Sequence, residues 1–258
     1  MLITVKGLVI RETPVGDFDK MLTVLTAEHG KISIFAKGSK KLKSPAFVCS
    51  QMFCYAEFVL RKTTDVYYIN DCSLVEGFFD IRNTLEGSAL ASYIAEVLND
   101  VATAVPDKNL MRLALNSLFA IASGKYNLAL VKGAFEIRCL SILGFMPDVH
   151  CCASCLGRSA DYFFDIMGGE IECADCRHSR ALTRSDYDSV HEARIICQLT
   201  EGARAALEYS IHAPIEKIFS FNVSDEDMRL FSRAAEEYIL NQLERSFRSL
   251  EFYKEVVR

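Results

Sequence analysis

The chain has 258 residues, half of them hydrophobic and 24% charged, a composition typical of folded proteins that excludes general disorder. Its formal net charge is -5 at pH 7, so net charge alone does not suggest nucleic-acid binding. Lys6 interrupts the apolar N-terminus, no small-residue cleavage site follows, and no apolar run is as long as a membrane span. We therefore expect a cytoplasmic protein without membrane association.

Residues 1–80 have the pattern of short β-strands. Gly30 suits a tight turn between two of them, and the strand candidates are residues 2–10, 21–26, 31–36, 51–62 and 65–77. Five short antiparallel strands fit a small closed barrel, because closure removes exposed strand edges. We predict an OB-fold barrel in residues 1–80. An SH3-like barrel has the same strand count, and the pattern leaves it open.

From residue 83 onward the hydrophobic period becomes helical, which predicts an α-helical domain over residues 81–258 and an α+β protein overall. Asn83 is the expected N-cap of the first helix, Thr183 can cap another, and Ser224 with Asp227 opens a long late one. The expected helices with stated bounds cover residues 83–104, 110–123, 128–144 and 225–246.

Four of the ten cysteines form two C-x2-C pairs, Cys152 with Cys155 and Cys173 with Cys176. Seventeen residues separate the pairs, a spacing that strongly indicates a zinc site. Four thiolates fill the coordination sphere of zinc, so we predict one structural Zn2+ per chain, in an insertion at about residues 148–180. Without an export signal, a disulfide framework is disfavoured.

Two alternatives to this zinc site remain. Two redox-active C-x-x-C pairs are disfavoured, because the βαβ context of a thioredoxin-like motif is absent. His150, Cys151 and His178 are close in sequence and can compete as ligands, although the two regular C-x2-C turns favour the four cysteines.

Positive charge gathers in KGSKKLK at residues 37–43, which contains Lys37, Lys40, Lys41 and Lys43. Residues 31–62 hold seven basic side chains against one acidic side chain, and Arg61 and Lys62 belong to this group. We predict that these six side chains contact nucleic-acid phosphates; the alternative is a solvated loop. Nearby aromatic side chains can stack on bases, although core packing is favoured for them: Phe35, Phe53 and Tyr55.

No catalytic motif is visible in the sequence. It contains no G-x-x-x-x-G-K-[ST], no G-x-G-x-x-G and no H-E-x-x-H pattern. A zinc deaminase would need an H-x-E pattern beside its metal ligands, which is also absent. We therefore expect that the protein is not an enzyme. Nothing in residues 1–80 distinguishes DNA from RNA, so an RNA-binding adaptor in translation or RNA processing is the alternative function.

Three stretches resemble the RecO family of bacterial recombinational repair proteins. They are residues 11–41 with the basic loop, residues 135–155 leading into the first cysteine pair, and residues 238–255 near the C-terminus. The resemblance implies an OB-fold that binds single- and double-stranded DNA, followed by a helical domain with the zinc site. The basic loop departs from the family, which often has arginine where this chain has only lysine.

The resemblance also implies a non-enzymatic function and its partners. RecO-like proteins anneal complementary strands coated by single-strand binding protein, and they help the recombinase RecA load at gaps. The implied partners are RecR and the acidic C-terminal tail of single-strand binding protein. For that tail, the resemblance points to the helix with Lys132, Phe135 and Arg138. Core packing of Phe135 is the favoured alternative.

Overall fold

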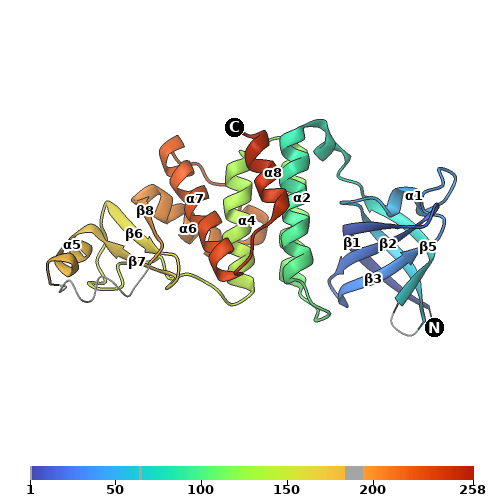
Figure 1. Ribbon diagram of the computed structural model, residues 1–258, viewed down its shortest axis with the longest axis horizontal. Coiled ribbons are helices and arrows are strands. Elements are labelled where there is room, and N and C mark those ends of the chain that lie inside the picture. The colour runs from blue at the N-terminus through green and yellow to red at the C-terminus, as the bar shows by residue number, and fades with distance from the viewer. Residues whose placement is uncertain (1, 64–65, 184–193) are drawn as a thin grey trace. The chain divides into compact units, whose positions relative to one another are not determined.

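The computed structural model describes residues 2–63, 66–183 and 194–258 (Figure 1). By its contacts the chain divides into two compact units, each described here by itself. The first unit comprises Met1–Lys125 together with Phe247–Arg258, and the second comprises Tyr126–Ser246. The domain boundary near residue 80 stays a prediction. Among the described helices, none combines the length and the apolar character needed to cross a membrane.

The first unit begins with a closed barrel, several of whose strands are labelled in Figure 1. The strand order is β1-β2-β3-β5-β4, and β4 pairs with β1 to close it. Only β3 and β5 pair in parallel; the other neighbours are antiparallel. This is the predicted OB-fold. Its strands are β1 (Leu2–Val15), β2 (Asp19–Thr26), β3 (Gly30–Ala36), β4 (Tyr55–Thr63) and β5 (Val66–Glu76).

Alternation along the strands fills the barrel with apolar side chains. Val24, Ile34 and Leu60 are fully buried on three different strands. Two features differ from the prediction. β1 continues through Val15, because a register shift after Val9 lets it stay paired with β2. β4 begins at Tyr55 rather than at residue 51, and a short helix that was not predicted, α1 (Ala46–Cys49), precedes it.

Helices complete the first unit: η1 (Phe79–Asn83), α2 (Leu85–Val101), α3 (Lys108–Ser123) and α8 (Arg248–Val256). The N-cap of α2 is Thr84, whose hydroxyl accepts a hydrogen bond from the Gly87 amide, so the predicted cap at Asn83 was wrong by one residue. At the C-terminal end of the chain, the Phe247 ring meets Tyr93 of α2 edge-on at 5.7 Å. The C-terminal helix α8 therefore packs against α2.

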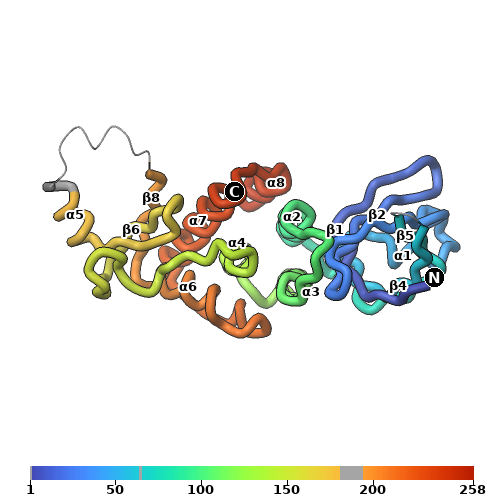
Figure 2. Tube along the Cα trace, turned by 90° about the horizontal axis from the view of Figure 1, so that it is seen from below, coloured from blue at the N-terminus to red at the C-terminus, as the bar shows by residue number. Residues whose placement is uncertain are grey.

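The second unit contains α4 (Leu128–Ile142), α6 (Glu201–His212) and α7 (Asp225–Gln242), which pack on one another (Figure 2). The predicted cap of α7 is confirmed, because Ser224 Oγ accepts a hydrogen bond from the Asp227 amide at 3.1 Å. Phe231 and Tyr238 of α7 are buried.

A small sheet that the sequence did not predict belongs to the second unit. Its strand order is β7-β6-β8, formed by β6 (Asp161–Asp165), β7 (Glu170–Cys173) and β8 (Ile196–Thr200), and both pairings are antiparallel. The helix α5 (Ala174–Thr183) follows β7 directly. The further helix predicted after Thr183 begins outside the described residues.

Candidate nucleic-acid interface and metal centre

The first cysteine pair lies on a tight turn held against the sheet. The Cys152 amide donates to the Gly157 carbonyl at 3.1 Å, and the Leu156 amide donates to the Cys152 carbonyl at 2.9 Å. The Ala153 amide donates to the carbonyl of Ile171 in β7 at 2.9 Å. The last of these bonds attaches the first C-x2-C turn to β7, the strand that ends at Cys173.

The second pair spans the junction of a strand and a helix. Cys173 ends β7, and Cys176 lies in the first turn of α5. The four sulfur atoms of both pairs lie within 4.8 Å of one another, and Cys155 Sγ is 3.9 Å from Cys173 Sγ. Tetrahedral zinc with sulfur at about 2.3 Å requires a sulfur separation of about 3.8 Å. The arrangement can therefore hold a metal ion.

The donor set also suits a cation electrostatically. Burial opposes ionisation of the Cys152 thiol, but backbone N–H groups at Cys173, Cys155 and Ser154 lower its pKa to about 6. Contacts with the sulfurs of Cys173 and Cys155 raise the pKa of Cys176 instead. Clustered thiolates repel one another, and a divalent cation at their centre removes that repulsion.

The competing ligands lie outside this group. Among the described residues, the only cluster able to hold a metal contains the four cysteines, without His150, Cys151 or His178. His150 Nδ1 is instead 2.6 Å from a Glu208 carboxylate oxygen.

A buried arginine, which the sequence reasoning missed, holds the segment before the metal ligands. Arg204 of α6 is 2% exposed, and its Nη1 donates to the Val149 carbonyl at 2.7 Å. The same guanidinium binds Glu201 at 2.7 and 2.8 Å and Glu208 at 2.8 Å. No sequence motif marks this arginine: Glu201 and Glu208 are ordinary neighbours on its own helix, and Val149, the partner near the metal centre, is 55 residues away.

The predicted basic loop, residues 37–43, is fixed to the turn between β1 and β2. The Lys40 amide donates to the Phe18 carbonyl at 3.0 Å, and Lys40 Nζ donates to the Gly16 carbonyl at 2.8 Å. The Gly38 amide donates to Asp19 Oδ1 at 2.6 Å. Lys40 therefore helps to join the two loops, while Lys37, Lys41 and Lys43 are exposed.

An outer-face row crosses three strands of the barrel. In the strand register Tyr68 of β5 is opposite Phe35 of β3 on one side and Arg61 of β4 on the other. The Phe35 and Tyr68 rings are 5.4 Å apart, and the Arg61 guanidinium lies 5.9 Å from the Tyr68 ring centre. Phe35 and Arg61 were predicted from the sequence, but Tyr68 was not, because the parallel β3–β5 pairing is not visible in local sequence patterns.

The other predicted residues of the interface have different positions. Lys62 is exposed, with its Nζ 5.6 Å from the Tyr67 ring centre. Phe53 is 7% exposed and packs in the interior, in agreement with the core packing that the sequence favoured. Tyr55 is half-buried, and burial raises the pKa of its hydroxyl. Of the three predicted aromatics, Phe35 is the one whose ring contacts Tyr68, the ring that the Arg61 guanidinium approaches.

The residues predicted to receive an acidic tail have internal contacts. Lys132 is 2% exposed, and its Nζ lies 3.0 Å from Glu136 and 2.8 Å from Glu236. Phe135 is fully buried, as its favoured alternative predicted. Arg138 donates to the Ser210 and Ala213 carbonyls. In this conformation Lys132 and Phe135 have no surface for a peptide, which counts against a tail site at these residues.

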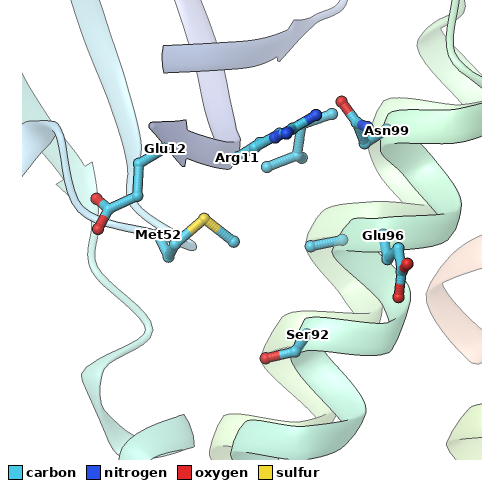
Figure 3. Close-up of a pocket in the computed structure, with 8 residues that line it drawn as sticks. Arg11, Glu12, Met52, Ser92, Glu96 and Asn99 are labelled. Carbon is cyan, nitrogen blue, oxygen red and sulfur yellow. The ribbon is translucent and has the colours of Figure 1, made fainter. Parts of the chain in front are cut away.

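A pocket of about 420 Å³ in the first unit lies apart from the basic loop. Figure 3 shows Arg11 and Glu12 of β1 and Glu96 and Asn99 of α2 among its lining residues. Glu12 already binds Lys20 at 2.8 Å, and Glu96 accepts a hydrogen bond from the Ser249 amide at 3.0 Å. One arginine beside two carboxylates does not suit a polyanion.

Comparison with known proteins identifies the family. Two family models match, Recombination protein O N terminal over residues 1–78 and Recombination protein O C terminal over residues 82–251. A DNA repair protein RecO from Acetivibrio thermocellus is 32% identical over 98% of this chain and 96% of its own length. The chain belongs to the RecO family. A second RecO, from Caldicellulosiruptor saccharolyticus, is 28% identical over 98% of both chains.

Membership connects the two candidate sites with DNA repair. The RecO N-terminal match covers the whole barrel with its basic loop and outer-face row. The RecO C-terminal match covers the four cysteines and Arg204. The resemblance expected from three short stretches is thereby confirmed over nearly the full length.

Proposed function

We propose that this RecO family member is a non-enzymatic DNA-binding mediator of recombinational repair. It anneals complementary single strands and helps a recombinase load at gaps together with RecR. The observation that carries the proposal is the basic loop fixed at one end of an OB-fold barrel, beside an outer face that carries Phe35, Tyr68 and Arg61. OB-folds bind oligonucleotides with this strand face and with neighbouring loops.

The chemistry of these groups suits binding without sequence preference. Exposed ammonium groups at Lys37, Lys41 and Lys43 contact phosphates as point charges, and phosphate contacts carry no base information. The row of aromatic rings and a guanidinium offers flat surfaces for bases. Annealing requires two polyanions close together, and clustered cations lower that electrostatic cost.

The metal in this proposal is one structural Zn2+ held by Cys152, Cys155, Cys173 and Cys176. Four cysteine ligands leave no open position for water or substrate, so the bound ion supplies folding energy and no reaction step. Its ligands join the first turn, β7 and α5. A backbone hydrogen bond from Ala153 to Ile171 already attaches the first turn to β7, and α5 follows β7 directly.

Partners follow from the family resemblance. We propose RecR and the acidic C-terminal tail of single-strand binding protein as protein partners, and the bacterial cytoplasm as the compartment, since that is where chromosomal DNA is repaired. Pull-down with single-strand binding protein and with its tail-deleted form tests the tail. Equal capture of both forms would exclude the tail as the contact.

The central test is annealing of two complementary oligonucleotides, with and without a single-strand binding protein coat. We expect annealing without ATP, and a variant with Lys37, Lys41 and Lys43 changed to alanine to lose most of it. The matched control changes three exposed lysines elsewhere, Lys108, Lys125 and Lys217, and so removes the same charge. Equal loss in both variants, or stronger binding to RNA than to DNA of the same sequence, would overturn the proposal.

A further inference from the structure

A large aromatic side chain stands exposed at the turn that supports the basic loop. Phe18, between β1 and β2, is 53% exposed, and Leu42 in the basic loop is 83% exposed. Single exposed apolar residues are ordinary on protein surfaces. These two belong to segments that hydrogen-bond to each other, so they mark one place where apolar and basic groups occur together.

The backbone that carries Phe18 is held on both sides. Its carbonyl accepts from the Lys40 amide at 3.0 Å, and the neighbouring Asp19 carboxylate accepts from the Gly38 amide at 2.6 Å. Gly16 and Gly38 have φ of +55° and +66°, a backbone conformation that glycine adopts without a Cβ penalty. The ring is therefore presented from a fixed turn, which reduces the entropy lost when a ligand stacks on it.

A cation lies over this ring. Lys41 Nζ is 4.7 Å from the Phe18 ring centre, within the range of a cation–π contact. Such a contact uses one face of the ring. A base stacked on the ring would bring its own phosphate toward the ammonium groups of the basic loop. The carboxylates of Asp17 and Asp19, on either side of Phe18, oppose this attraction.

We propose that Phe18 stacks on an unpaired base and makes the basic loop selective for single strands over duplex. The inference rests on the proposed DNA-binding function. It identifies Phe18 as the residue of the interface that distinguishes single-stranded from double-stranded DNA. Bases in a duplex already stack on their neighbours, so the ring gains a partner only when a base is free. Lysines alone bind both forms through phosphates.

The chain contains no tryptophan, so Phe18→Trp introduces the only indole. We expect single-stranded oligo(dT) to quench the fluorescence of this variant, because a stacked base contacts the indole directly. Heparin, a polyanion without bases, and a duplex of equal length should bind with much less quenching. Equal quenching by oligo(dT), duplex and heparin would overturn the proposal, as would single-strand binding without any quenching.

Affinity gives a second, independent measurement. Phe18→Ala should weaken oligo(dT) binding about tenfold, with an unchanged salt dependence because no phosphate contact is lost. Phe18→Tyr should bind like wild type, whereas Phe18→Leu, apolar but not aromatic, should resemble Phe18→Ala. Phe119→Ala, which removes a 64% exposed ring from α3, is the matched control.

The outcomes separate the two proposals. If the wild type fails to bind oligo(dT), the proposed function falls. If the wild type binds and anneals but Phe18→Ala behaves like Phe119→Ala, only the stacking role falls. If Phe18→Leu binds like wild type, the side chain serves as apolar packing and the stacking role is excluded.

Discussion

Arg204 Nη1 donates a 2.7 Å hydrogen bond to the main-chain oxygen of Val149, three residues before the first metal-ligand candidate. The guanidinium is buried and also holds two carboxylates of its own helix, Glu201 and Glu208. This single side chain therefore connects the stability of α6 with the position of the first C-x2-C turn.

Arg204→Ala should lower the free energy of unfolding by about 2–4 kcal/mol, because it leaves the buried Val149 carbonyl without its donor and removes the guanidinium from two carboxylates. It should also speed metal release to a competing chelator, since the turn before Cys152 loses its support. Urea denaturation and a colorimetric zinc-release assay measure the two effects. Arg229→Ala, an exposed change on α7, is the control. If Arg204→Ala were as stable as the wild type, this role of Arg204 would be contradicted.

Local signals predicted a large part of this fold. The barrel followed from alternation, the cap of α7 from Ser224 and Asp227, and the four-cysteine group from its spacing alone. Each of these features depends on residues close in sequence. Other features depend on pairings between distant segments, which local periodicity does not encode. They are the order of strands around the barrel, the three-stranded sheet β7-β6-β8 and the contact of Arg204 with Val149.

Lys132 shows why a functional site is harder to predict from the sequence than a strand or a helix. In the sequence, a lysine near Phe135 suggests a cation beside an apolar pocket. In the fold, Glu136 one helical turn later and Glu236 from α7 both reach its ammonium group. Only Glu136 is near enough in sequence to predict, so the burial of this charge could not be inferred from α4 alone.

The acid sensitivity of the second unit should depend partly on Asp227. Hydroxyl groups of Thr200 and Ser224 donate to its carboxylate and hold its pKa below the ordinary value of 3.8. The lowered pKa contributes stability that is present above about pH 3.8 and is lost as pH falls through the folded-state value.

Asp227→Asn removes this titration. The difference in the free energy of unfolding between wild type and variant should stay constant from pH 5 to 7 and become smaller below about pH 3.8. Urea denaturation across this range measures this difference, in which metal loss that both proteins share cancels. A difference that grows on acidification would contradict the assignment.

Purified protein should contain one zinc per chain. Cys173→Ser removes a ligand that is 4% exposed and is expected to abolish tight metal binding and lower the melting temperature. The barrel should remain folded, because its core contains none of the four cysteines. Elemental analysis measures the metal, and oligonucleotide binding reports on the barrel. Chelator-free preparations without zinc would contradict the prediction, and Cys197→Ser is the control for a buried cysteine outside the group.

The lysines of the basic loop should differ in their contribution to salt dependence. Each phosphate contact to single-stranded DNA contributes about 0.7 to the slope of log affinity against log salt. Changing Lys37, Lys41 and Lys43 together to alanine should reduce the slope by about 2 if all three make contact. The Lys108, Lys125 and Lys217 triple variant should leave it unchanged, although its net charge is the same.

Single variants refine this expectation. Lys40 Nζ already donates to the Gly16 carbonyl at 2.8 Å, whereas Lys43 is exposed. Lys43→Ala should therefore lower the salt slope by about 0.7 with little change in stability. Lys40→Ala should lower the slope less but weaken the hold between the two loops, which faster amide exchange at Gly38 and Lys40 would report. If Lys40→Ala and Lys43→Ala lower the salt slope equally, and amide exchange at Gly38 and Lys40 is unchanged, then Lys40 binds phosphate as its neighbours do and does not hold the two loops together.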